Sequence, residues 1–369
     1  MSDDKKVESI LSENRKFDPI ELNSDYAKSG LSMEDYKKMW QASIDDKEAF
    51  WGEQAKSLDW FKSYDKVWEA TDLFPGKWFT GGKLNVAYNC IDRHVKNGKG
   101  DHVAIIWEAD EPDNVRKFTY SELQIEVSKC ANGMKKLGLK KGDRVTIWLP
   151  MIPSLAIVML ACARIGVIHS IVFGGFSKEA VKDRVEDSDS RLLFTCDETL
   201  RAGKIYPKMA DVVQIIDKCP TIEHVIVVKH TGNDVPSTSK DITYDDFIAG
   251  VSDDCPCEEM DAEDTLFILY TSGTTGKPKG VKHTTAGYIL YTSFTHKYVF
   301  NYKEGEVWYC TADIGWITGH SYIIYGPLAN GATTLMFESV PTYPDVDRFW
   351  DICEKHKVTQ FYTLSLIHI

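Results

Sequence analysis

The sequence predicts an α/β fold in which mostly parallel β-sheets are flanked by helices. From residue 102 onward, short apolar segments of strand length alternate with segments of helical periodicity. Several of the short segments are apolar on both faces, which is typical of strands in a parallel sheet that helices cover on both sides. With 369 residues, of which 43% are hydrophobic and 27% charged, the chain is long enough to bury a large core.

The first 95 residues differ from the rest of the chain. They are rich in Trp, Tyr and charged residues and contain helical-looking pieces such as residues 33–62, but few alternating runs. We interpret residues 1–95 as an N-terminal cap that packs on a larger domain. We expect that domain to cover residues 96–363.

The first strand and helix of the larger domain are predicted from local signals. Residues 102–107 form an apolar run of strand type. Thr119 and Glu122 have the spacing of a capping box, which predicts that a helix begins there. Apolar residues then recur at helical spacing until Gly138, which is typical of a helix end.

The same alternation continues along the chain. We expect further strands at residues 144–149, 167–173, 191–195 and 224–229, helices at 154–165, 178–187 and 206–218, and surface loops at 230–241 and 258–264. The long apolar stretch 147–163 contains Pro150 and Pro153, so it is better explained as strand, turn and buried helix than as a membrane span.

Charge and cysteine content exclude several classes of partner. A formal net charge of −12 argues against a protein that binds nucleic-acid phosphates, so we expect no nucleic-acid partner. The polar start of the chain offers no signal peptide, which predicts a cytoplasmic protein with no membrane partner. The nine cysteines lack the paired spacing of a disulfide framework or zinc site, so no protein metal site is expected.

One motif carries clear chemistry. Residues 266–270 read as a buried strand that leads directly into Thr-Ser-Gly-Thr-Thr-Gly-Lys-Pro-Lys-Gly at residues 271–280. Its glycines allow the backbone to approach a ligand, its hydroxyls can donate to phosphate oxygens, and its lysines compensate negative charge. It is not a Walker A loop, because Pro278 stands where that motif has Ser or Thr. The alternative, a flexible linker, is disfavoured by the strand immediately before it.

This motif resembles the phosphate-binding signature of the adenylate-forming enzymes. Stretches at residues 83–94, 169–177, 312–322 and 325–333 narrow the resemblance to the short-chain acyl-CoA synthetases, in particular the AMP-forming acetate–CoA ligases. The resemblance implies the large N-terminal domain of the adenylate-forming fold. It also implies a reaction in which acetate attacks the α-phosphate of ATP, bound with Mg²⁺, to form acetyl-AMP, after which the thiol of coenzyme A displaces AMP.

The resemblance also implies roles for individual residues in binding ATP. Lys277 and Thr274 would be the catalytic residues of this part of the protein, because they would help diphosphate leave. The residues that would bind the phosphates of ATP are Thr271, Ser272, Gly273, Thr274, Thr275, Gly276, Lys277 and Lys279.

A second set of residues would bind coenzyme A and the acyl group. Arg201, Ala202, Gly203 and Lys204 match an element that touches the nucleotide end of coenzyme A; the four residues alone favour a solvated basic turn, and only the resemblance reverses that interpretation. Ile317 and Thr318 would line the acyl pocket, Thr318 and Thr342 would contact coenzyme A, and His320 is expected to be simply packed and hydrogen-bonded.

The resemblance ends at residue 363. We expect residues 364–369 to be a non-native tail, the small C-terminal domain with its catalytic lysine to be absent, and the chain alone to be inactive. Two further functions stay open: a ligase for propionate or another short-chain acid, and a non-catalytic nucleotide-binding module. The sequence does not predict an oligomeric state.

Overall fold

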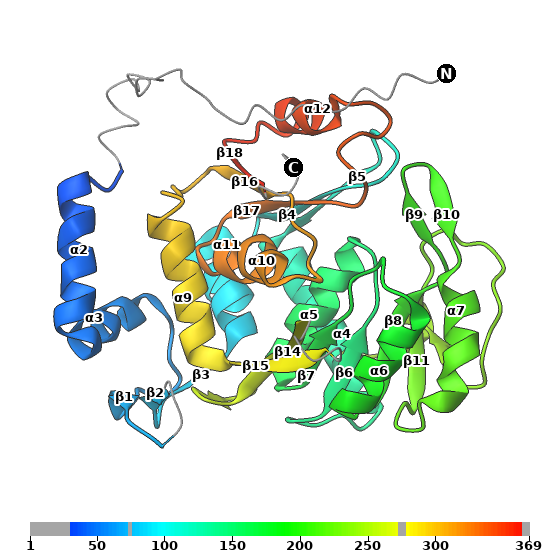
Figure 1. Cartoon of the computed structure of the whole chain (residues 1–369), viewed down its shortest axis with the longest axis horizontal. Helices are drawn as coiled ribbons and strands as arrows, with labels where there is room; N and C mark the ends of the chain where they lie inside the picture. The colour runs from blue at the N-terminus through cyan, green and yellow to red at the C-terminus, as the bar shows by residue number, and fades with distance from the viewer. Residues whose placement is uncertain (1–29, 73–75, 272–277, 364–369) are drawn as a thin grey trace, which may run out of the picture.

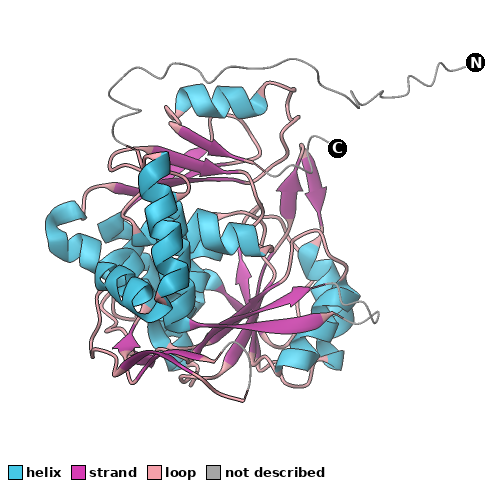
Figure 2. Cartoon of the chain, turned by 60° about the vertical axis from the view of Figure 1, so that its left-hand side comes forward, coloured by secondary structure: helices cyan, strands magenta, loops and turns pink. Residues whose placement is uncertain are grey.

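The structure, a computed structural model, describes residues 30–72, 76–271 and 278–363 (Figure 1). Its larger sheet contains, in spatial order, β12 (Asp241–Thr243), β11 (His224–Val228), β8 (Leu192–Cys196), β6 (Arg144–Ile147), β7 (Ile168–Ile171), β14 (Thr265–Thr271) and β15 (Lys279–Thr284). All neighbours are parallel except the antiparallel pair β14 and β15. Figure 2 shows helices on both sides of this sheet, as predicted for a mostly parallel α/β fold.

A second sheet of five strands lies beside the first. Its spatial order is β18 (Gln360–Tyr362), β16 (Val307–Cys310), β17 (Thr333–Phe337), β4 (Val103–Glu108) and β5 (Val115–Thr119). Only β4 and β5 are antiparallel neighbours. The strand predicted at residues 102–107 is therefore present as β4, but it belongs to a different sheet from the strands predicted at residues 144–149, 167–173, 191–195 and 224–229.

Several helices follow the predicted local signals. Thr119 Oγ1 accepts the N–H of Glu122, and Glu122 Oε2 accepts the N–H of Thr119, so the capping box that starts α4 (Tyr120–Lys136) is confirmed. The buried helix α5 (Pro153–Ile165) packs against α4. The remaining predicted helices are α6 (Lys178–Ser188) and α7 (Lys208–Ile215), the latter followed by the single turn η4 (Ile216–Lys218).

Three predicted boundaries were wrong. Residues 33–62 form two helices, α2 (Met33–Asp45) and α3 (Lys47–Gln54), and a turn η1 (Ala55–Ser57), because Asp46 leaves the helical conformation and caps α3 through the N–H of Ala49. The helix expected from residue 206 begins after Pro207, since the preceding residues form a strand. The loop expected at residues 258–264 contains β13 (Met260–Asp261), which pairs with β3 (Lys83–Leu84).

The segment after β3 is buried in the core. It contains the π-helical turn η2 (Tyr88–Asp92), whereas the turn η3 (Val95–Lys99) that follows has no buried residue. Asp92 accepts two hydrogen bonds of 2.8 Å from the guanidinium of Arg164, and both side chains are largely buried. The division of the chain at residue 95 stays a prediction.

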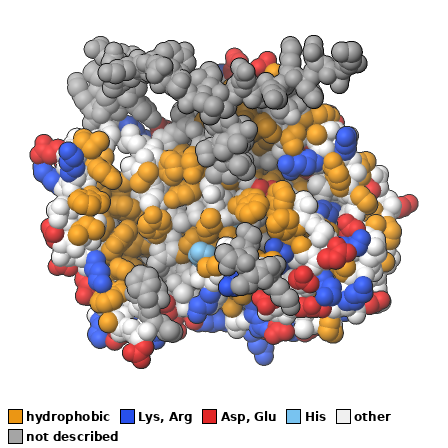
Figure 3. Space-filling model, viewed as in Figure 1, with side chains coloured by type: hydrophobic (Ala, Val, Ile, Leu, Met, Phe, Trp, Pro, Cys, Tyr) orange, Lys and Arg blue, Asp and Glu red, His pale blue; other side chains and the backbone are white. Residues whose placement is uncertain are grey.

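The remaining elements cover the sheets or project from them. They are β1 (Lys66–Glu69), β2 (Lys77–Thr80), β9 (Thr199–Arg201), β10 (Lys204–Tyr206), α8 (Tyr244–Ile248), α9 (Thr285–Tyr298), α10 (Ile317–Gly319), η5 (His320–Tyr325), α11 (Gly326–Ala329) and α12 (Arg348–Lys355). Figure 3 shows apolar side chains gathered over the left part of one face, where α2 and α9 lie; Met33, Trp40, Ile44 and Tyr291 are among the exposed ones.

All nine cysteines lie in the described part of the chain, and none forms a disulfide. Seven are buried, and only Cys257 and Cys353 are partly exposed. Within residues 30–72, 76–271 and 278–363, no helix combines the length and apolar character needed to cross a membrane.

Candidate functional site

The basic element at residues 201–204 is the turn of a β-hairpin. Arg201 ends β9, Lys204 begins β10, and the two residues pair across the hairpin. Ala202 and Gly203 between them have φ angles of +53° and +70°. Ala202 is thus held in a conformation that non-glycine residues seldom adopt. Hydrogen bonds from the turn to Asp110 hold it in this conformation.

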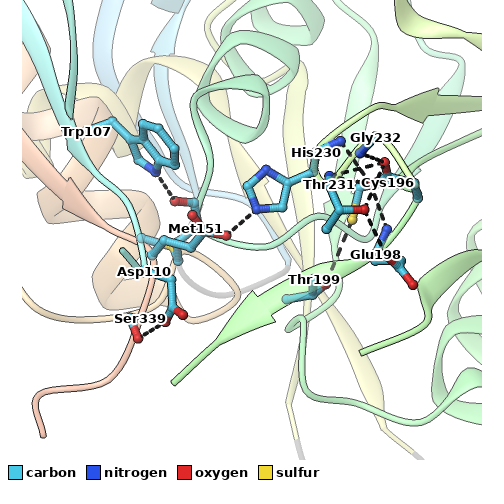
Figure 4. A network of polar contacts seen from close by, with 12 residues as sticks. Trp107, Asp110, Met151, Cys196, Glu198, Thr199, His230, Thr231, Gly232 and Ser339 are labelled. Carbon is cyan, nitrogen blue, oxygen red and sulfur yellow. Dashed lines mark hydrogen bonds and ion pairs between the residues drawn. The ribbon is translucent and has the colours of Figure 1, made fainter. Parts of the chain in front are cut away.

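One buried carboxylate fixes the turn. The two oxygens of Asp110 accept the N–H groups of Ala202 and Gly203, each at 2.7 Å. The hydroxyl of Ser339 donates to Asp110 and accepts the N–H of Ala202 at 3.2 Å. Hydrogen bonds to a charged acceptor are the stronger kind, so they can offset the strain at Ala202. Asp110 follows β4 and Ser339 follows β17 (Figure 4), and the hairpin is therefore attached to the five-stranded sheet.

The segment around Thr342 lies against the same turn. A Cβ atom at Gly203 would come within 2.7 Å of the hydroxyl of Tyr343, so both the φ angle and the space require glycine there. Thr342 itself is exposed. The structure thus brings the hairpin and the neighbour of Thr342 together, as the assignment of both to coenzyme A would require.

A cavity of about 340 Å³ lies beside this hairpin. Its lining includes Arg201 from β9, Gly174 and Gly175 from the segment after β7, and Asp313 and Glu338 from the segments after β16 and β17. The carboxyl ends of strands from both sheets therefore contribute to one cavity, which is where α/β proteins usually bind ligands.

Lys208 brings a buried amine to this cavity. Its side chain donates to the carbonyl of Gly174, and its Nζ lies 3.8 Å from the centroid of the Trp148 ring. Only 6% of the residue is exposed, and this burial lowers the pKa of Lys208 to about 8. The amine remains mostly protonated at neutral pH, so it adds positive charge to the cavity.

Two carboxyl groups oppose that charge. Burial raises the pKa of Asp313 to about 6, although the N–H of Gly315 donates to it at 2.6 Å and Arg201 adds a favourable charge. Glu338 is fully buried and pairs with His230, with 2.5 Å between Oε1 and Nε2. The cavity is therefore lined by both signs of charge.

His230 is fixed by a second buried carboxylate. The oxygens of Asp197 accept the N–H groups of His230, Thr231 and Gly232, which follow β11. Burial is the largest single effect and would lower the pKa of His230, but the hydrogen bond to Glu338 and the negative charges of Glu338, Asp197 and Asp110 together outweigh it and raise that pKa. The residues expected to be a plain surface loop after residue 229 therefore start with an ordered buried network.

The phosphate motif joins two antiparallel strands. Thr271 is the last residue of β14 and Lys279 the first of β15, and these two residues are paired across the strands. Both residues are exposed, and β15 is an edge strand of the seven-stranded sheet. The other predicted phosphate ligands, Ser272, Gly273, Thr274, Thr275, Gly276 and Lys277, lie outside the described residues.

The predicted acyl-pocket residues lie in the short helix α10. Ile317 is 40% exposed and lines a second cavity of about 770 Å³, together with Tyr288 and His283. Thr318 is half-buried and lines neither of these two cavities. Of the two predicted acyl-pocket residues, Ile317 therefore lines the cavity of about 770 Å³ and Thr318 does not.

A stack of rings lies behind the second cavity. Phe267 stacks on His283 with centroids 4.4 Å apart, and His320 lies 4.6 Å from Phe267 on centroids. His320 Nδ1 lies 3.1 Å from the carbonyl oxygen of Trp316, so the expectation that His320 is packed and hydrogen-bonded holds for this nitrogen. Burial lowers the pKa of His320 to about 4, so the ring is neutral near pH 7.

Comparison with known families adds the decisive observation. The AMP-binding enzyme family matches residues 91–368, and the family described as acetyl-coenzyme A synthetase N-terminus matches residues 36–90. The chain belongs to the AMP-binding enzyme family. Among the described residues of this AMP-binding enzyme, no group of three or more His, Cys, Asp or Glu side chains is arranged to hold a metal ion.

Curated relatives of this AMP-binding enzyme carry the name acetyl-coenzyme A synthetase. The protein from Alkalilimnicola ehrlichii is 56% identical over 340 residues, which are 91% of this chain and 52% of the relative. The protein from Syntrophus aciditrophicus is 57% identical over 333 residues, which are 89% of this chain and 51% of the relative. The chain spans about half the length of the curated relatives it matches.

Sequence reasoning missed five residues around the hairpin of this AMP-binding enzyme: Asp110, Lys208, His230, Glu338 and Ser339. A signal existed for Asp110, because it follows the strand predicted at residues 102–107, and ligands of α/β sheets gather at carboxyl ends. Glu338 and Ser339 directly follow β17. Because that strand was not predicted, the sequence contained no signal for either residue.

Proposed function

We propose that this chain forms the ATP- and coenzyme A-binding part of an AMP-forming acetate–CoA ligase, with acetate, ATP and coenzyme A as small-molecule substrates in the cytoplasm. The structural observation that carries the proposal is the hairpin with Arg201 and Lys204, held by Asp110 beside a cavity of about 340 Å³. The names of the relatives, which are about 55% identical to this chain, point to the same reaction.

In the first step, acetate attacks the α-phosphate of ATP and diphosphate leaves. Lys277 and Thr274 stabilise the charge that develops on the departing phosphates, and Thr271 and Lys279 frame the motif at the strand ends. Magnesium accompanies ATP and supplies further positive charge to the phosphates. Because the nucleophile is already present, these residues act mainly by positioning and charge.

In the second step, the thiol of coenzyme A displaces AMP from acetyl-AMP. Arg201 offers a planar fork to a phosphate of coenzyme A, and Lys204 adds a point charge across the turn. Thr342 supplies a hydroxyl near the hairpin. Ile317 and Thr318 bound the acyl pocket.

Two measurements test the proposal. The 369-residue chain is titrated with ATP and with coenzyme A, and binding of both is expected. For the reaction, the matched 340 residues of the Alkalilimnicola ehrlichii relative are replaced by those of this chain, and ATP–diphosphate exchange is measured with acetate, propionate and butyrate. Acetate is expected to support the fastest exchange; faster exchange with propionate would contradict the assignment.

The Lys277→Ala variant of that hybrid separates the two steps. It should slow formation of acetyl-AMP, whereas thioester formation from supplied acetyl-AMP should change much less. An equal loss in both steps would contradict the proposed role of the phosphate motif.

A further inference from the structure

The side chain of Tyr270 contacts both strands that carry the phosphate motif. Tyr270 directly precedes Thr271 in β14, and it pairs with Gly280 in β15, the last residue of the motif. A Cβ atom at Gly280 would lie 3.3 Å from the Tyr270 ring and 2.9 Å from Cγ2 of Ile268. The absence of a side chain at Gly280 therefore lets the ring lie directly on the backbone of β15.

Two side chains of the helix α6 hold the same ring. The hydroxyl of Tyr270 donates to Oδ2 of Asp187 at 2.6 Å, across 83 positions of sequence. The guanidinium carbon of Arg184 lies 5.3 Å from the centre of the ring, which is within the range of a cation–π contact. Burial and the bond to Asp187 raise the pKa of Tyr270, so its hydroxyl stays protonated near neutral pH and acts as the donor.

The helix that supplies these contacts is itself firmly placed. Val181 and Val185 of α6 are fully buried in the core. Arg184 is only 6% exposed, and its Nη1 donates to the carbonyl of Ala180 at 2.7 Å. A side chain on a packed helix is held more precisely than one on a loop, so α6 can serve as a fixed support for Tyr270.

The support lies beside the phosphate motif. A cavity of about 350 Å³ is lined by Arg184, Asp187 and Tyr270 together with Pro278, which belongs to the motif. The contacts of α6 with Tyr270 thus act where β14 ends and the motif begins.

We propose that Asp187 and Arg184 position the phosphate motif for ATP by holding the ring of Tyr270. The inference rests on the proposed function, since it adds a support to the same motif. Asp187, Arg184 and Tyr270 are positioning residues that act through the strand ends. Strands that are already held in place lose less freedom when the motif binds phosphate, so binding is tighter.

Titration of the 369-residue chain with ATP tests the contact. Tyr270→Phe removes only the hydroxyl and should weaken ATP binding about fivefold, while coenzyme A binds as before. Asp187→Asn should weaken ATP binding less than Asp187→Ala, because its amide oxygen still accepts the hydroxyl of Tyr270. Glu179→Ala, a change on the exposed first turn of the same helix, is the control and should bind ATP as the parent does.

A double variant tests whether the two residues act together. Tyr270→Phe and Asp187→Ala remove the same hydrogen bond, so the variant with both changes should bind ATP about as weakly as the weaker single variant. Losses that multiply in the double variant would overturn the proposed coupling.

The hybrid with the Alkalilimnicola ehrlichii relative separates positioning from general damage. Tyr270→Phe should raise the KM for ATP in ATP–diphosphate exchange and leave thioester formation from supplied acetyl-AMP unchanged, which a loss of folded protein would not do. Equal losses in both steps, or ATP binding unchanged in Tyr270→Phe, would overturn the role of this contact and leave the proposed function standing. A parent chain that does not bind ATP would overturn both.

Discussion

The Oδ2 atom of Asp110 accepts the backbone N–H of Gly203 at 2.7 Å. The two residues are far apart in sequence and belong to different sheets, since Asp110 follows β4 and Gly203 lies in the β9–β10 turn. This bond and the bond from the N–H of Ala202 to Oδ1 of Asp110 determine where the basic side chains of the hairpin lie relative to the cavity.

Asp110→Ala should weaken binding of coenzyme A. The change removes two hydrogen bonds to a charged acceptor, each worth about 1.5–3 kcal/mol, and frees a turn that Ala202 does not favour. We expect a loss of about tenfold or more in affinity for coenzyme A and little change for ATP, measured by titration. Asp113→Ala, which changes an exposed carboxylate in the neighbouring β4–β5 connection, is the control. Equal losses for both ligands would show general damage to the fold.

Replacement of both Arg201 and Lys204 by alanine tests the charge of the hairpin. Charge-assisted contacts to phosphate are worth about 1–3 kcal/mol each, so coenzyme A should bind about tenfold more weakly or worse, while ATP binds as before. The effect should shrink at high salt, because exposed charges are screened.

Dephospho-coenzyme A sharpens this second prediction. The parent should prefer coenzyme A over the dephospho form, and the double variant should discriminate less between them. Unchanged affinity for coenzyme A in a folded double variant would mean that the hairpin is a solvated basic turn.

His320 should make the fold less stable in mild acid. Its pKa is about 4 in the folded protein, below the ordinary value of 6.5, so between these values the unfolded chain binds a proton that the folded chain does not. Stability is therefore lost as pH falls from about 6.5 towards 4, by about 3 kcal/mol from this ring alone. Urea unfolding of the parent and of His320→Asn across this range should show a shallower pH dependence in the variant. His224→Asn is the control. The same pH dependence of stability in the parent and in His320→Asn would contradict the assignment of this loss to His320.

The ion pair between Arg164 and Asp92 should matter for stability because it is buried. Arg164→Ala leaves the carboxylate without its partner, which typically costs about 3–5 kcal/mol. Lys38→Ala removes one side of the exposed pair with Glu34 and should cost less than about 1 kcal/mol. Urea unfolding of both variants measures the difference, and similar midpoints would contradict the prediction.

Local signals in the sequence predicted local structure well. The capping box at Thr119 and Glu122 gave the start of α4, and the apolar run before residue 271 gave β14, because both depend on neighbours in sequence. The division into two sheets was not predictable in this way. It depends on β4 pairing with β17, which lies more than two hundred residues further along the chain.

The residues of the candidate site show the same difference between local and long-range information. Arg201 and Lys204 could be named from the sequence, because the motif that contains them is continuous. The position of Asp110 after a predicted strand was visible, but its contact with the hairpin was not, since that contact arises only when segments far apart in the sequence meet at one cavity. The break between α2 and α3 at Asp46 was also missed. Asp46 is a common N-cap residue, but the helical pattern of the sequence continues through it, so the pattern predicted no break.

The burial of seven of the nine cysteines makes this chain suitable for site-specific labelling once the partly exposed Cys257 and Cys353 are replaced by serine. Burial raises the pKa of the thiols of Cys90, Cys130 and Cys196 to about 12, so almost no reactive thiolate is present near neutral pH. A cysteine introduced on the exposed β10 strand, for example by Ile205→Cys, would therefore react with a maleimide dye far faster than the buried native thiols. A fluorophore attached there would report directly on movement of the hairpin when a ligand enters.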